Sequence, residues 1–530
     1  MKRGALLAIG LALLVVGPAL RPDVLLGHEN LDNWSHAWGM HWFASSLASG
    51  TVPWEVTGAA YPASRVLWYV DPMGALLASP LQLISPAAAY NGLAFFQIAV
   101  AAFCGWGFGR ALGGQGWVAA VGVATMPLLQ TELHNGVVEA AWVGLIAGAG
   151  WLAARGSRWT GVVVGLVGIA SPYHGLGAGV LAGVLLLSGE GSWKRRLGLT
   201  ALAAGVSIGV ALPHMWMLAE GFRSTEPFVL RPLWNGLNDP SMRVNATDWM
   251  AFLRPGDFWS LAPSDAAGAV PWKHTPYLGW VLLVGAVVGW RRGHRWLIAP
   301  FVFSVIISLG YFLWHDEDWV RTADGGRYML PLGVVSQWVQ VELTHHMRFA
   351  GLACVVLAGV ADRGVGRFGW MVAIAVGAEN LLVAPNCWPP PTSSAAVPAV
   401  YAESAGAVVD LPAARGESNA TNRYLYYQAV HGRSVPWNNK VGMTGYMNPT
   451  LKDWVELSKV GQTARAEGLD SLVADGFTTV VLHPELMERP DLLTRHRRVL
   501  DAQLGPPSEQ EGRLVYALDA APGQSEGNKE

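Results

Sequence analysis

The feature that most constrains this chain is a succession of long apolar segments. Eleven of them lie in the first 384 residues, near 1–20, 89–109, 116–133, 140–154, 159–171, 175–189, 197–219, 276–290, 296–314, 345–361 and 368–384. A helix needs about 20 apolar residues to cross the ~30 Å hydrocarbon layer of a bilayer. The sequence therefore predicts a polytopic α-helical membrane protein with about eleven transmembrane helices.

Charged residues are scarce and unevenly divided. They make up 14 % of the chain, against about 25 % in typical soluble proteins. Of the 74 Lys, Arg, Asp and Glu residues, 44 lie in residues 1–384 and 30 in the last 146. This division predicts a transmembrane domain over 1–384 and a region of different character after it.

The C-terminal region has the pattern of a small α/β domain. A Pro-rich linker at 385–400 precedes a predicted domain at 401–520 and a polar, disordered tail at 521–530. Short β-like runs alternate with helical stretches: the runs are 407–412, 477–483 and 514–518, and the helical stretches are 449–474 and 485–498. Such alternation indicates strands covered by helices.

Basic residues predict the orientation in the membrane. Short connections rich in Lys and Arg remain cytoplasmic. Alternate connections carry these residues here, namely Lys2, Arg3, Arg110, Arg155, Arg158, Lys194, Arg195, Arg196, Arg291, Arg292, Arg295, Arg363 and Arg367. We therefore expect a multi-pass protein of the bacterial inner membrane with a cytoplasmic N-terminus and an extracytoplasmic C-terminal domain. Three long loops, 21–88, 220–275 and 315–344, then face outward.

Several functional classes are excluded by what the sequence lacks. The formal net charge is −2 and there is no basic stripe, so nucleic acid is not an expected partner. The three cysteines lack metal-ligand spacing. The chain contains no phosphate-binding loop, no nucleophile elbow and no His-Glu-x-x-His zinc motif.

Ionisable residues gather at the predicted outer ends of the helices. These are Glu29, Asp32, His36, His41, His134, Glu139 and His174. Ionisable groups at membrane depth are costly and are usually kept for a function. A carboxylate there can accept a proton from a hydroxyl that attacks a sugar, and Asp32 is our candidate general base. The alternative is that Asp32 only caps the following helix.

Other residues are candidates for substrate or phosphate binding. Arginine offers a bidentate fork to phosphate oxygens. The outward candidates are Arg321, Arg327, His345, His346 and Arg348, together with His134 and His174. The run 315–318 contains oxygen ligands suited to Mg or Mn, but it is more typical of a solvated loop. No metal ligand is assigned, and a divalent cation is left open as a cofactor.

The segment after the first apolar run predicts an aromatic helix face. Trp34, Trp38 and Trp42 recur every four residues, so a helix here presents all three on one side. We expect this side to lie along the membrane surface.

The order of several short motifs resembles bacterial members of the GT-C superfamily. The motifs are Leu31-Asp32-Asn33-Trp34-Ser35-His36-Ala37-Trp38, Tyr61-Pro62, Asp71-Pro72, Ser79-Pro80-Leu81, Ser171-Pro172-Tyr173-His174-Gly175, His346-Met347-Arg348-Phe349, Val409-Asp410-Leu411-Pro412, Tyr426-Tyr427-Gln428-Ala429-Val430-His431-Gly432 and Val480-Val481-Leu482-His483. These enzymes are polytopic glycosyltransferases that take sugar from a polyprenyl-phosphate carrier. The first outer loop supplies their catalytic acid, which corresponds to Asp32 here, and Glu139 is the nearest candidate for a second acid.

The resemblance implies a membrane glycosyltransferase that moves a hexosyl or pentosyl group. Its partners would be membrane lipid, a polyprenyl-phosphate-linked sugar donor and a glycan, lipid or protein acceptor on the extracytoplasmic face. Two alternatives remain: a transporter or flippase of a lipid-linked glycan, and a non-catalytic membrane assembly protein with a GT-C-like fold. Transporters often show inverted repeats and charges near the middle of the membrane, and neither is evident here.

Overall fold

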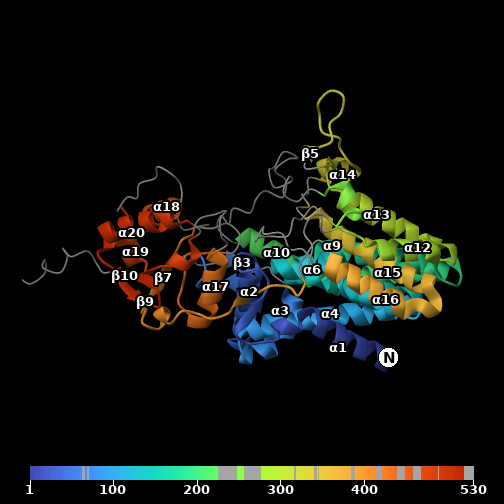
Figure 1. Ribbon diagram of the computed structural model, residues 1–530, viewed down its shortest axis with the longest axis horizontal. Helices are drawn as coiled ribbons and strands as arrows, with labels where there is room; N and C mark the ends of the chain where they lie inside the picture. The colour runs from blue at the N-terminus through green and yellow to red at the C-terminus, as the bar shows by residue number, and fades with distance from the viewer. Residues whose placement is uncertain are drawn as a thin grey trace, which may run out of the picture.

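A computed structural model shows an elongated, mostly helical molecule (Figure 1). The structure describes residues 1–62, 66–67, 71–224, 247–255, 276–315, 318–339, 343, 345–383, 388–413, 420–438, 448–457, 467–487 and 489–518. Apolar helices form one end of the molecule, and the C-terminal sheet with its helices forms the other.

The first 383 residues are dominated by helices. They are α1 (Lys2–Val16), α2 (Asn33–Ala48), α3 (Pro72–Ala78), α4 (Pro86–Ala111), α5 (Trp117–Ala124), α6 (Pro127–Asn135), α7 (Gly144–Ala154), α8 (Thr160–Ala170), α9 (Pro172–Ser188), α10 (Trp193–Ser224), α12 (Trp280–Arg291), α13 (Ile298–Ser308), α14 (Pro331–Val339), α15 (Ala350–Val365) and α16 (Gly369–Ala378). Short strands β1 (Val24–Leu26), β2 (Glu55–Val56), β3 (Val66–Leu67), β4 (Trp314–His315) and β5 (Asp318–Trp319) lie in the loops between them.

Each predicted apolar segment contains a helix, but the helices differ in length. Among the described residues, four helical runs are long and apolar enough to cross a membrane: Lys2–Ala19, Pro86–Ala111, Trp193–Glu220 and His346–Val383. Shorter apolar helices occupy Val138–Ala154, Thr160–Ala170, Pro172–Ser188, Trp280–Arg291 and Arg295–Ser308. The predicted total of eleven spans therefore stays a prediction.

The segment predicted as one helix at 116–133 is broken in two. Met126 is extended, with φ −54° and ψ 143°, and Pro127 starts the new helix α6. Proline has no backbone N–H and disfavours helical geometry in the preceding residue, so a break here follows from the sequence. The break redirects the chain so that α6 ends near the loop that follows α1.

Small residues allow the helices to pack closely. A Cβ atom on Gly289 of α12 would lie only 2.1 Å from the carbonyl oxygen of Val360 in α15. In the reverse direction, a Cβ atom on Gly364 would lie 2.5 Å from the carbonyl oxygen of Gly285. The two backbones are thus in direct contact, which is typical of helix pairs in membranes.

Two acidic residues within apolar segments satisfy helix ends elsewhere in the bundle. Asp362 accepts hydrogen bonds from the backbone N–H groups of Gly116 and Val118 at the start of α5. Glu379 accepts from the N–H of Trp280 at the start of α12, at 2.7 Å. Because the first N–H groups of a helix have no partner within it, these carboxylates act as caps.

The C-terminal residues form a four-stranded sheet with the order β7-β8-β10-β9. Its strands are β7 (Ala407–Leu411), β8 (Phe477–Leu482), β9 (Ser508–Gln510) and β10 (Arg513–Ala517), and the helices are α17 (Ala420–His431), α18 (Pro449–Glu456), α19 (Leu469–Ala474) and α20 (Pro490–Leu504). β7 and β8 are parallel, whereas β10 pairs antiparallel with both β8 and β9. The three predicted β-like runs match β7, β8 and β10. The boundaries of the predicted domain stay a prediction, and the predicted tail at 521–530 lies outside the described residues.

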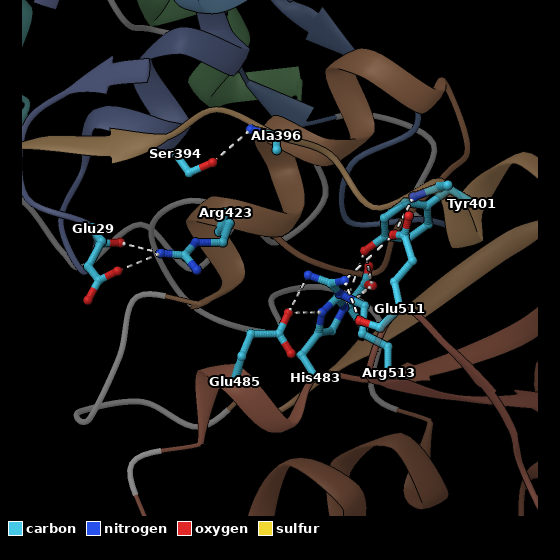
Figure 2. A network of polar contacts seen from close by, with 11 residues as sticks. Glu29, Ser394, Ala396, Tyr401, Arg423, His483, Glu485, Glu511 and Arg513 are labelled. Carbon is cyan, nitrogen blue, oxygen red and sulfur yellow. Dashed lines mark hydrogen bonds and ion pairs between the residues drawn. The ribbon is translucent and has the colours of Figure 1, made fainter. Parts of the chain in front are cut away.

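A buried polar network lies at the carboxyl ends of β7 and β8 (Figure 2). Tyr401 donates to Oδ1 of Asp410 at 2.7 Å, and Nε2 of His483 lies 3.0 Å from the same oxygen. Nδ1 of His483 lies 3.3 Å from Oε1 of Glu485, which also accepts from Arg513 at 2.7 Å. We call these five residues the sheet network.

The first loop joins the C-terminal part of the chain through a small sheet. β1 pairs antiparallel with β6 (Thr392–Ser394), with Val24 opposite Ser394 and Leu26 opposite Thr392. β6 thus lies within the segment 385–400 that was predicted as a linker. The pairing fixes the loop against residues almost 370 positions further along the chain.

Helix α17 packs on α2, and this contact corrects the prediction for the Trp face. Trp34 and Trp38 are only 1 % and 3 % exposed. The ring of Trp34 meets Tyr426 edge-on at 5.2 Å, and Nε1 of Trp38 donates to Gln428 at 2.8 Å. These two rings therefore face α17 rather than the membrane surface, because a distant helix supplies their partners.

Candidate functional site

The loop that follows α1 is held against the end of α6 by its backbone. The N–H of His28 donates to the carbonyl of His134 at 2.9 Å, and the N–H of Asp32 donates to the carbonyl of Asn135 at 3.1 Å. Gly136 follows with φ +79°, and a Cβ atom there would lie 2.3 Å from the backbone nitrogen of Asn33. Glycine is therefore required for this close approach.

The side chain of Asp32 does not cap α2. Asp32 occupies the position before the helix, but its carboxylate makes no capping hydrogen bond. Instead, Oδ1 accepts a hydrogen bond from Nδ2 of Asn422 in α17 at 3.0 Å. The side chain is half-buried, whereas the residues that follow it in α2 are buried. Helix capping thus does not account for this carboxylate.

Glu139 and His36 form a second pair of groups beside Asp32. Nδ1 of His36 lies 3.3 Å from Oε2 of Glu139, and their side chains are 9 % and 24 % exposed. The charges of Asp32 and Glu139 both interact with Tyr90 and with Glu132. The two carboxylates therefore lie in one neighbourhood, as the sequence predicted.

The two remaining histidines of the predicted set lie in the same neighbourhood. Nε2 of His174 lies 2.8 Å from the carbonyl oxygen of Ala140, next to Glu139. The ring of His134 stacks on His28, with centroids 5.8 Å apart. The structure thus brings together Asp32, His36, His134, Glu139 and His174, which we call the helix-end cluster.

Buried polar atoms around this cluster have no hydrogen-bond partner among the described residues. They include both side-chain atoms of Asn33 and of Asn135, the hydroxyl of Tyr90 and Nδ1 of His174. All four residues are at most 2 % exposed. Buried polar groups in folded proteins are nearly always paired with protein or water. These atoms are therefore available to polar groups of a ligand or to water.

Asp71 lies beside the cluster and was not predicted as a site residue. Its carboxylate accepts from the N–H of Gly74 at 2.8 Å and from Nε1 of Trp142. Burial raises the pKa of Asp71 to about 7, and the charge of Glu139 adds to this rise, although the two hydrogen bonds oppose it. The motif Asp71-Pro72 was the sequence signal. Both carboxylate oxygens accept hydrogen bonds, so Asp71 joins the start of α3 to Trp142.

Arg348 forms a buried ion pair with Glu132. Its Nε and Nη2 atoms donate to the carboxylate of Glu132 at 2.8 and 3.3 Å, and its guanidinium lies 5.7 Å from the ring centroid of Tyr173. The Glu132 side chain is fully buried. The sequence pattern did not single out Glu132, although an acid at the end of an apolar run is a signal. Phosphate binding by Arg348 stays a prediction.

The histidines before Arg348 pack against tyrosines. The backbone N–H of His345 donates to the Tyr173 hydroxyl at 3.2 Å. His346 is 2 % exposed and meets Tyr311 edge-on at 5.8 Å. A Cβ atom on Gly310 would lie 2.3 Å from Nε2 of His346, so this ring is tightly enclosed. Both ring nitrogens of His346 are buried without a hydrogen-bond partner among the described residues, so its predicted role in phosphate binding stays a prediction.

Arg321 and Arg327 are not brought to the helix-end cluster. They belong to the loop between α13 and α14, which projects from the top of the molecule in Figure 1, away from α2. Arg321 donates to the carbonyl of Gly325 at 3.4 Å. The Arg327 guanidinium lies over Phe312 and Trp319, at 5.4 and 5.3 Å. Their predicted role at the same site has no support from these positions.

The described part of the chain contains no group of three or more His, Cys, Asp or Glu side chains placed to hold a metal ion. Two residues of the run considered for Mg or Mn, Asp316 and Glu317, lie outside the described residues.

Comparison with known proteins identifies the fold. No family profile matches the chain, and no curated protein matches it. The arabinofuranosyltransferase AftD from mycobacteria, solved by cryo-electron microscopy, is similar in structure, with a TM-score of 0.61 and 13 % identity. The chain has the GT-C fold. The similarity covers 98 % of this chain but only 40 % of AftD.

Further structures with the GT-C fold are similar at lower scores. A mutant form of mycobacterial AftD gives a TM-score of 0.54 at 14 % identity, covering 98 % of this chain and 42 % of that chain. The oligosaccharyltransferase AglB from Archaeoglobus fulgidus, in complex with an inhibitory peptide and a dolichol-phosphate, gives 0.42 at 12 % identity. That match covers 91 % of this chain and 68 % of AglB.

Proposed function

We propose that the protein is a membrane glycosyltransferase that takes a sugar from a polyprenyl-phosphate-linked donor. The GT-C fold and the apolar helices support a membrane glycosyltransferase at a coarse level, since the similar structure AftD is an arabinofuranosyltransferase. The observation that carries the proposal is the carboxylate of Asp32. It is half-buried, does not cap its helix and lies beside buried polar atoms that have no partner among the described residues.

The proposed chemistry is a direct displacement at the sugar carbon. A hydroxyl oxygen of the acceptor attacks the anomeric carbon while the bond from that carbon to the phosphate oxygen breaks. Asp32 takes the hydroxyl proton, and the polyprenyl phosphate leaves with the bonding electrons. General-base assistance of this kind is typically worth ~10²–10⁴-fold in rate.

The other members of the helix-end cluster have supporting roles in this proposal. His36 is held by Glu139 and lies one helical turn after Asp32, so it orients the acceptor rather than reacting. His134 and His174 are the phosphate candidates that lie in the cluster. A hexosyl or a pentosyl group, and a glycan, lipid or protein acceptor, all fit this scheme. A divalent cation stays open as a cofactor of this reaction.

We propose that the reaction takes place on the extracytoplasmic face of the bacterial inner membrane. The distribution of Lys and Arg supports a cytoplasmic N-terminus and an extracytoplasmic sheet region. Reporter fusions at Arg292 and Gly505 test this orientation, and we expect opposite sides for the two positions. Equal reporter behaviour at both would contradict it.

The substitution Asp32→Asn tests the proposed base. It keeps the size of the side chain and removes the carboxylate, so we expect transfer from polyprenyl-phosphate pentoses or hexoses to fall ~10²–10⁴-fold in membranes containing the protein. Asp23→Asn is a matched control, because Asp23 lies on the same loop but is exposed and pairs with Arg21. We expect the control to retain transfer.

The outcomes separate the proposal from its alternatives. Near-normal transfer by the Asp32→Asn protein, at an equal level of inserted protein, would remove Asp32 from the mechanism. Absence of transfer by the unmodified protein with every pentose and hexose donor would favour a transporter of lipid-linked glycans or an assembly protein.

A further inference from the structure

Helix α17 contributes side chains directly to the first outer loop. Arg423 donates to the carbonyl oxygen of Glu29 at 3.3 Å and lies 3.6 Å from the Glu29 carboxylate (Figure 2). Its guanidinium also lies 4.8 Å from the ring centroid of Trp34. The first turns of α17 are thus fastened to the loop on both sides of Asp32.

Asn422 donates a hydrogen bond to the carboxylate of the proposed base, Asp32. It is 3 % exposed, and its Nδ2 donates to Oδ1 of Asp32 at 3.0 Å. Among the described residues, Oδ2 of Asp32 has no hydrogen-bond partner. An amide that holds one carboxylate oxygen fixes the direction in which the other oxygen points.

We propose that Asn422 is a positioning residue for the base Asp32, so that the C-terminal region completes the site formed by the helix ends. This inference rests on the proposed function. By holding Oδ1, Asn422 aims Oδ2 at the acceptor hydroxyl, and Oδ2 is the oxygen that takes the proton. A misplacement of about 1 Å in a reacting group can cost ~10²-fold in rate, which is why orientation matters here.

A simpler account is that Asn422 only docks α17 on α2. The structure offers a matched control for this account. Gln428 lies in the same helix and accepts a hydrogen bond from Trp38 of α2 at 2.8 Å, but it belongs to the docking contact and not to the contact with Asp32. Loss of the Gln428 contact therefore weakens docking alone.

The experiment compares Asn422→Leu, Asn422→Asp and Gln428→Leu in the sugar-transfer assay. Leucine is branched at Cγ like asparagine but cannot donate a hydrogen bond, so we expect kcat to fall ~10–100-fold with KM changed less than about threefold. Asn422→Asp keeps the shape but places a like charge beside Asp32, so we expect an equal or larger loss. Gln428→Leu should lower kcat less than about threefold.

A double-mutant cycle tests whether Asn422 acts through Asp32. If it does, Asn422→Leu adds no further loss of transfer in an Asp32→Asn protein, since the base it orients is already absent. Independent losses that multiply in the double mutant would overturn the inference. Equal losses for Asn422→Leu and Gln428→Leu would also overturn it, because docking would then explain both.

The test distinguishes failure of this inference from failure of the proposed function. Normal kcat in folded Asn422→Asp protein would refute the positioning role and leave the transferase proposal intact. Absence of transfer by the unmodified protein with every donor would refute both proposals together.

Discussion

The helix-end cluster and the sheet network are built from the same kinds of residue but differ in their pairing. In the sheet network, the imidazole of His483 lies between the carboxylates of Asp410 and Glu485, and Arg513 binds Glu485 as well. In the helix-end cluster, the contact to the Asp32 carboxylate is a neutral amide. Oδ2 of Asp410 also has no hydrogen-bond partner among the described residues, so the two groups differ in the charge of their contacts and not in whether every polar atom is paired.

We expect the largest loss of stability from a substitution in the sheet network. Asp410→Ala removes a fully buried carboxylate that holds Tyr401 and His483. Breaking a buried pair by removing one partner typically costs about 3–5 kcal/mol in the free energy of unfolding. Chemical denaturation in detergent, with Glu509→Ala on the exposed edge strand as control, measures this loss. A loss below about 1 kcal/mol would show that the network does not stabilise the sheet.

We expect a smaller effect, on the rate of sugar transfer, from a substitution of His36 in the helix-end cluster. His36→Gln keeps a polar side chain next to Glu139 but loses the ring that contacts it. Because this residue orients rather than reacts, we expect sugar transfer to fall about tenfold, less than for Asp32→Asn. Thermal unfolding should change little. A loss of transfer as large as that of Asp32→Asn would instead make His36 a reacting group.

The smallest expected effect is the change in the stability of the sheet with pH. Burial raises the pKa of Glu485, but hydrogen bonding and attraction from His483 and the charge of Arg513 lower it overall, to about 2. Burial lowers the pKa of His483, but hydrogen bonds to Asp410 and Glu485 raise it overall. The Glu485 contribution is present above about pH 4.5 and is lost as pH falls toward 2.

The His483 contribution has the opposite sign. A raised pKa in the folded state stabilises the fold fully below about pH 6.5 and is lost as pH rises through the folded-state value. We therefore expect the stability of the sheet to be greatest between about pH 4.5 and 6.5. Glu485→Gln should reduce the loss in the free energy of unfolding at acid pH by about 1 kcal/mol. The effect is small because solvent screens this half-exposed group. Chemical denaturation at several pH values measures this. If the free energy of unfolding of the Glu485→Gln protein falls at acid pH as much as that of the unmodified protein, Glu485 is not the group responsible.

The sequence predicted the helix-end cluster because its signals are local. Asp32, Glu139 and His174 each follow or precede an apolar segment, and segments that alternate across a membrane place such residues on one side. The β-like runs were equally local, since strands of Val and Leu bounded by turns can be recognised without knowledge of their neighbours. Both predictions needed only the position of a residue relative to its own segment.

The partners of these residues could not be predicted in the same way. Asn422 and Asp32 are 390 positions apart, and Glu132 and Arg348 are 216 apart. Nothing in the periodicity of α17 indicates that α2 lies against it, so the Trp34 and Trp38 rings were assigned to the membrane surface. Pairing across a fold depends on how helices pack, and a single sequence does not record this.

The pairing of β1 with β6 has a consequence for the order in which the protein assembles. Chains are made from the N-terminus, so the loop that carries Asp32 leaves the ribosome near the beginning of synthesis. Its strand partner, Thr392–Ser394, is made only after the last apolar helix, α16. The loop thus acquires its strand partner late, only after 394 of the 530 residues have been made.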